Sequence, residues 1–260
     1  MRWLGKRLTS DPGTILLVVL SPALAYYGMW RKASSYWPAG LNSHEKLVPC
    51  GNTTLPRDVL SHANEFFSKL SSLQGAAFSE TLHWGLFAVF FLSGAFVAYS
   101  FGRALSTGDV INVIPLLGSK GRTFIEYFKV SLLYALFLSG TLAFSSGLIF
   151  ETYSFSVEPK LVISVFLAFF GSALWGISLA LLTLSLLREH ASALLSLIGV
   201  VLLASSGGNT GAVLMPYDQV FLWVFSGFRT SPSKYAVLGV VLSVLSLVAA
   251  YLIFERRDIG

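Results

Sequence analysis

Six runs of apolar residues, joined by connections of very different length, dominate this 260-residue chain. They cover residues 13–30, 83–101, 123–150, 161–187, 191–205 and 235–254. A helix needs about 20 residues to cross a bilayer, so five runs approach or exceed that length and 191–205 is short. Open sheets cannot span lipid, and the alternation typical of a membrane β-barrel is absent. The pattern predicts an all-α membrane protein with six transmembrane helices.

Basic residues in the short connections predict the orientation of these helices. They are Arg2, Lys6, Arg7, Arg103, Lys120, Arg122, Arg188, Arg256 and Arg257. Because Lys and Arg are enriched in cytoplasmic loops, we expect both termini, the connection 102–122 and the tail 255–260 to be cytoplasmic. The connections 31–82 and 206–234 then lie outside. The first of these also carries basic residues, but long loops contribute little to this rule.

The first run has features of a secretory signal as well as of a spanning helix. A basic segment precedes it, and Ala23-Leu24-Ala25 resembles a cleavage site. The run nevertheless continues through an aromatic belt and a basic anchor over 26–32, which suits a membrane exit. We therefore expect a retained span. Ser10 and Asp11 are placed to cap it, with Pro12 in its first turn.

Three segments outside the runs are also predicted to form helices. Residues 1–12 have basic and apolar sides, which predicts an interfacial helix on the membrane surface. Within 31–82, apolar residues recur at helical spacing over 59–70 and predict an amphipathic helix. The loop 206–234 contains the apolar stretch 220–225, which is too short to span and predicts a re-entrant or surface helix.

The composition restricts the chemistry available to the chain. Hydrophobic residues make up 54% of it and charged residues only 12%, with a formal net charge of +5. The basic residues border apolar runs and form no stripe with aromatic residues, so nucleic acid is not expected as a partner. Cys50 is the single cysteine, which excludes a disulfide framework and a cysteine-rich metal site.

The middle of every run lacks ionisable residues, which argues against several classes of function. A proton-coupled carrier, an ion pump or an intramembrane zinc protease needs such groups within the membrane. The segment Gly118–Thr123 also lacks the spacing of a phosphate-binding loop. We expect no catalytic residue, metal site or cofactor in this chain, and any ATP hydrolysis to take place in a partner protein.

The connection 102–122 is unusually apolar for a cytoplasmic segment. Asp109 is placed to cap a short helix over 110–114 that Pro115 would end. Such an apolar helix needs a cover, which is either the lipid headgroups or a docked cytoplasmic protein. The candidate site consists of Asp109, Val110, Ile111, Val113, Ile114, Pro115, Leu116, Leu117, Lys120 and Arg122.

Two sequence features resemble a known family. The chain closes on an aromatic-x-basic-basic-Asp-aliphatic pattern over 254–259, and the interior connection has Gly108, the aliphatic run 110–117, Ser119-Lys120 and then Lys129. Together with six spans and two interior ends, this pattern resembles the membrane subunit (permease) of a type-2 ABC exporter.

The resemblance implies a plasma-membrane assembly of two permease subunits, identical or related, with two cytoplasmic ATPase subunits. It makes 109–117 the coupling helix that engages the ATPase, where ATP and Mg would bind. Arg256, Arg257 and Asp258 would then lie near the ATPase, although Arg256 and Arg257 equally suit simple retention of the C-terminus inside. The cargo would be amphipathic or hydrophobic.

Alternative interpretations stay open at this level. The chain could pass ATPase motion to an extracytoplasmic partner through 31–82 and 206–234 without carrying cargo, as a mechanotransmission or assembly subunit. A different class would be a stand-alone intramembrane enzyme or a structural membrane protein. Small residues at 93–94 and 171–176 suit packing within the chain or a dimer seam. Asn52-Thr53-Thr54 is a glycosylation acceptor sequence.

Overall fold

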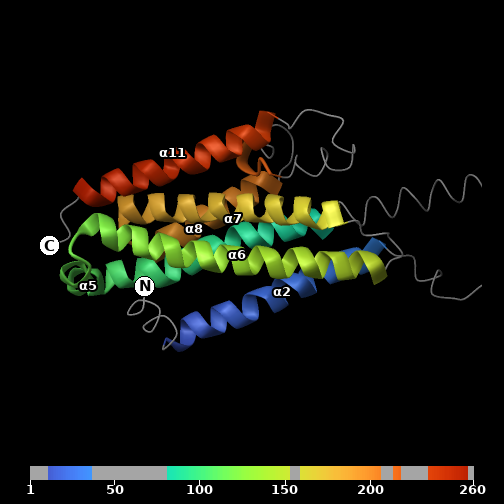
Figure 1. The fold of residues 1–260 in the computed structure, drawn as a ribbon, viewed down its shortest axis with the longest axis horizontal. Helices are drawn as coiled ribbons and strands as arrows, with labels where there is room; N and C mark the ends of the chain where they lie inside the picture. The colour runs from blue at the N-terminus through green and yellow to red at the C-terminus, as the bar shows by residue number, and fades with distance from the viewer. Residues whose placement is uncertain (1–10, 37–80, 153–158, 206–212, 218–233, 257–260) are drawn as a thin grey trace, which may run out of the picture.

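The computed structural model describes residues 11–36, 81–152, 159–205, 213–217 and 234–256, which form a bundle of helices (Figure 1). In chain order these are α2 (Pro12–Tyr36), a helix over 81–97 that continues into η1 (Ala98–Gly102) and α4 (Arg103–Ser106), α5 (Asp109–Leu117), α6 (Lys120–Thr152), α7 (Pro159–Leu187), α8 (His190–Ser205) and α11 (Lys234–Arg256). These described segments contain no strand, so the predicted all-α class is confirmed.

Five of the helices are long and apolar enough to cross a membrane: α2, the helix over 81–106, α6, α7 and α11. The shorter α8 has 16 residues, about 24 Å at 1.5 Å per residue. Several helices extend past the predicted apolar runs: α2 continues to Tyr36, and α6 begins at Lys120. Five such helices indicate a multi-pass membrane protein.

Helix α7 lies at the centre of the bundle and contacts α6, α8 and α11. Its Phe169, Ile177, Leu181 and Leu184 are fully buried. In Figure 1, α2 packs along one edge beside α6 and α11 covers the opposite edge. Many large aliphatic side chains of these two outer helices are exposed, as in helices that face lipid.

Helix α7 and the helix over 81–97 approach each other closely through small residues. A Cβ atom added to Gly176 would overlap the backbone carbonyl of Phe90, and one added to Gly94 would lie 3.0 Å from the carbonyl oxygen of Gly176. The Ser172 hydroxyl donates a hydrogen bond to the carbonyl of Leu86 over 3.1 Å. The small residues identified in the sequence therefore pack within this chain.

Successive long helices run in alternating directions, so the ends of several helices gather at the end of the bundle that holds α5 (Figure 1). We call this the α5 end. The start of α2 lies there, because Asp11 contacts Arg103. The end of α11 lies there as well, because Phe254 packs against Phe101 and Phe124.

Several predictions fall outside the described residues. They concern residues 1–10 of the interfacial helix predicted over 1–12, the amphipathic helix and acceptor sequence within 37–80, the apolar stretch 220–225, and the tail residues Arg257 and Asp258.

Candidate coupling site

Two glycines set the limits of α5. Gly108 precedes the helix with a φ of +74°, and Gly118 follows it with a φ of +85°. L-residues with a Cβ rarely adopt this left-handed region, so glycine suits both positions. The Gly118 N–H donates to the carbonyl of Ile114 over 2.9 Å and closes the last turn.

Two details predicted for this helix are wrong. The N-cap is Gly108, and Asp109 is the first helical residue, where its charge still suits the positive end of the helix dipole. Pro115 does not end the helix but lies inside it. Proline has no N–H to donate to the carbonyl of Ile111, yet the helix continues to Leu117 and ends at Gly118.

The apolar residues of α5 divide between two faces. Val110 and Val113 are fully buried, and Ile114 packs partly against the core. On the other side Ile111 is 48% exposed and Leu116 is 66% exposed. We call the side formed by Ile111, Asn112, Pro115 and Leu116 the exposed face of α5; all four residues are exposed. The helix is thus anchored to the bundle and still presents an apolar surface.

The remaining predicted residues lie in the last position of α5, beside it or at the same end of the bundle. Leu117 and Lys120 are half-buried, while Arg122 is exposed in the first turn of α6. Arg256 is the exposed last residue of α11. The structure therefore brings the described part of the predicted set to one end.

Behind α5, an aromatic cluster joins three helices. Phe101 is fully buried, and its ring centroid lies 4.6 Å from that of Tyr127, 5.4 Å from Phe254 and 6.2 Å from Phe124. Aromatic pairs at these separations add to the stability gained from burial alone. The cluster connects the helix that leads into α5 with α6 and α11, and sequence reasoning did not identify it.

The helix that leads into α5 contains a π-helical turn, η1, which was also not predicted. It holds an extra residue per turn just before Arg103. Gly102 lies in this turn, where an added Cβ would meet the side chains of Leu184 and His190. Because π turns are rare and frequently occur at functional sites, η1 supports the α5 end of the bundle as a candidate functional region.

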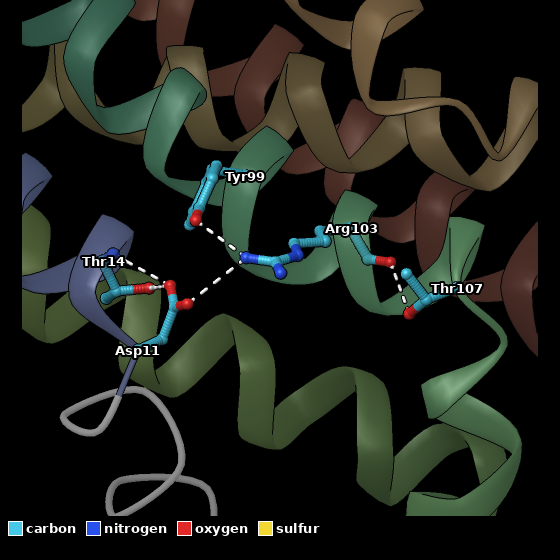
Figure 2. Close-up of polar contacts among 5 residues, drawn as sticks. All are labelled: Asp11, Thr14, Tyr99, Arg103 and Thr107. Carbon is cyan, nitrogen blue, oxygen red and sulfur yellow. Dashed lines mark hydrogen bonds and ion pairs between the residues drawn. The ribbon is translucent and has the colours of Figure 1, made fainter.

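A polar network around Arg103 connects α2 to the helix that contains η1 and α4 (Figure 2). One guanidinium nitrogen of Arg103 lies 3.3 Å from an Asp11 carboxylate oxygen and 2.9 Å from the Tyr99 hydroxyl. The other Asp11 oxygen accepts hydrogen bonds from the Thr14 backbone N–H, over 2.9 Å, and from its hydroxyl, over 2.8 Å. The Thr107 hydroxyl donates to the Arg103 carbonyl over 2.9 Å.

Asp11 is the N-cap of α2, and Pro12 is its first residue, so both predictions are confirmed. Burial acts to raise the pKa of Asp11, but hydrogen bonds from Thr14 and Tyr99 and the charge of Arg103 outweigh it. The pKa of Asp11 is therefore held below its usual value.

A scan against models of protein families finds no match for the sequence, and a search of curated proteins finds none either.

Proposed function

We propose that this chain is the transmembrane permease subunit of an ATP-driven ABC exporter, and that α5 is its coupling helix. The observation that carries the proposal is the exposed face of α5. Its Ile111 and Leu116 project from the end of the bundle, while Val110 and Val113 fix the helix from behind. A persistent apolar surface of this kind favours coverage by a partner.

The length of α6 favours a protein over lipid as that partner. Its uncharged part begins at Val130, and Lys120 lies ten residues earlier, about 15 Å along the helix. The headgroup layer adds only about 5–8 Å on each side of the hydrocarbon core. In the proposed arrangement α5 therefore lies beyond the headgroups, where a cytoplasmic ATPase can reach it.

The contacts behind α5 support transmission of motion. Helix α5 packs on α6, and η1 contacts α7 and α8. Displacement of α5 would therefore act on the aromatic cluster and, through Arg103, on α2. In the proposed mechanism, ATP closes the ATPase pair and α5 passes this movement to the spanning helices as a rigid-body shift.

In the proposed arrangement the chain crosses the plasma membrane six times, with α8 as the fifth span. The α5 end then lies in the cytoplasm. Arg103, Lys120, Arg122, Arg188 and Arg256 belong to segments at this end, which agrees with the enrichment of basic residues in cytoplasmic loops. A second copy or a related permease completes the pair, and ATP and Mg bind only to the ATPase subunits.

The test is purification of the full chain from its native membranes in a mild detergent. We expect an ATPase with a phosphate-binding loop to co-purify in stoichiometric amount and to hydrolyse ATP in the complex. A chain that purifies without such an ATPase and converts a lipid or peptide unaided would overturn the proposal.

A second measurement separates export from mechanotransmission. Inside-out vesicles containing the complex should accumulate an amphipathic fluorescent cargo only when ATP is supplied. ATP hydrolysis that continues without stimulation by, or uptake of, any cargo in a panel of lipids and amphipathic peptides would favour the mechanotransmission role.

A further inference from the structure

At the end of the bundle opposite α5, a cavity of about 420 Å³ lies between α2 and the helix over 81–97. Tyr27, Arg31, Lys32, Ser35 and Trp84 line it. Its volume falls in the range of small-ligand sites. Two neighbouring cations and two aromatic rings in one cavity favour an anionic ligand at a membrane surface.

The position of the cavity along α2 matches the second face of a bilayer. Arg31 follows Asp11 by twenty residues, about 30 Å along the helix axis. This distance equals the thickness of the hydrocarbon core. With Asp11 and Arg103 near one interface, the cavity lies at the other, where Tyr and Trp are the favoured residues.

The two cations of the cavity have no carboxylate partner within the described part of the chain. The described ion pairs join Arg103 to Asp11 and Lys129 to Glu126. Lys32 instead places its Nζ atom 5.3 Å from the centre of the Trp84 ring. Such a contact orients the ammonium group without neutralising its charge, which leaves it available to an anion.

An apolar stripe leads along α2 to the same cavity. Leu16, Leu20, Leu24 and Tyr27 are all exposed, and their spacing of three or four residues places them on one helix face. Arg31 continues this face by one more turn. A free phosphate would use only the cations, whereas a phospholipid would use both the cations and the stripe.

We propose that the cavity binds the headgroup phosphate of an anionic phospholipid, in the leaflet opposite α5. The phosphate lies between Arg31 and Lys32, and an acyl chain follows the stripe from Tyr27 to Leu16. The site requires only that the chain spans a membrane, so it stands independently of the proposed coupling to an ATPase.

The experiment measures lipid binding to the purified full chain by native mass spectrometry. The probes are phosphatidylglycerol and phosphatidylcholine with identical acyl chains. We expect phosphatidylglycerol to occupy one tight site in preference to phosphatidylcholine. The double variant Arg31→Gln, Lys32→Gln should bind phosphatidylglycerol about 25-fold more weakly, from about fivefold per cation near a membrane surface.

A matched control removes the same charge from the α5 end. The double variant Arg188→Gln, Arg256→Gln should leave the tight site unchanged. Arg31→Gln alone, which alters an exposed side chain, should weaken binding about fivefold and covers the case in which the double variant fails to fold. Excess inorganic phosphate should not displace the lipid, because it lacks the contacts with the stripe.

Three results would overturn the proposal. The first is equal affinity for the two lipids. The second is the same loss of affinity in the double variant and in its control. The third is displacement of phosphatidylglycerol by inorganic phosphate at equal concentration, which would assign the cations to a soluble anion.

Discussion

Among single residues, Arg103 joins the parts of the α5 end most directly. Its guanidinium group contacts Asp11 and Tyr99, and its carbonyl accepts from Thr107. Asp11 and Arg103 are 92 residues apart in the sequence, so no local pattern predicts their contact. The capping role of Asp11, by contrast, follows from its position just before Pro12.

Substitutions of Asp11 separate the contribution of the N-cap to stability from that of the ion pair with Arg103. Asp11→Ala removes both and should lower the free energy of unfolding by about 1–2 kcal/mol. Asp11→Asn keeps a capping oxygen and should cost less than about 1 kcal/mol, because Arg103 is largely exposed. Unfolding in detergent checks this. Equal losses in the two variants would show that the cap contributes little.

The same carboxylate predicts a pH dependence. Because the folded state lowers the pKa of Asp11 from 3.8, its stabilisation is complete above the unfolded pKa and is lost as pH falls through the folded value. The Tm difference between wild type and Asp11→Asn should stay constant from about pH 7 to about pH 5 and shrink below about pH 4. A difference that grows in acid would contradict this assignment.

At the scale of the elements, the contact between α7 and the helix over 81–97 leaves no room for added atoms. Gly176→Ala would press a Cβ against the carbonyl of Phe90, which belongs to a helix backbone and cannot rotate away. We expect a loss of about 1–3 kcal/mol in the free energy of unfolding. The matched control is Gly199→Ala on α8, which has open space and should be neutral or stabilising.

Thermal unfolding followed by size-exclusion chromatography distinguishes these two glycine variants. Gly176→Ala should lower the Tm, and Gly199→Ala should hold or raise it. If both variants unfold like wild type, the two helices separate more easily than their packing implies.

Helix α5 illustrates what sequence reasoning predicted about this site and what it missed. Its apolar residues and position between two spans were predictable, because both follow from a local pattern. Its C-terminal end was placed wrongly, because the helix continues past Pro115 to Leu117, with Val110 and Val113 buried against the bundle. The aromatic cluster and η1 depend on contacts between segments that are far apart in the sequence. Local patterns in a single sequence do not predict such contacts.

At the scale of the whole molecule, the long helices separate two chemically different ends, and the twenty residues of α2 from Asp11 to Arg31 correspond to about 30 Å along its axis. One end carries α5 and the Arg103 network, and the other carries the cavity at Arg31 and Lys32. The apolar runs predicted such helices because a span requires many consecutive apolar residues. The pairing of α2 with α6 and of α11 with α7 required the structure.

The sidedness of the two ends can be tested with single cysteines. In a Cys50→Ser background, Ser106→Cys next to α5 and Ser35→Cys at the other end each replace an exposed serine. A membrane-impermeant maleimide applied to intact cells should label Ser35→Cys, and it should label Ser106→Cys only after permeabilisation. Labelling of both from the same side would contradict the proposed topology.

The central claim is that the exposed face of α5 engages an ATPase. The most direct test measures the ATPase activity recovered with the purified chain after Ile111→Asp or Leu116→Asp, which place a charge on that face. The control, Ala191→Asp, adds the same charge to an exposed position in the first turn of α8 at the same end. Size-exclusion chromatography verifies that all three variants fold.

We predict that Ile111→Asp and Leu116→Asp each reduce the recovered ATPase by roughly tenfold, since loss of a central interface contact costs more than about 1 kcal/mol. Ala191→Asp should retain wild-type recovery. Full recovery of the ATPase with both α5 variants would contradict the assignment of α5 as the coupling helix.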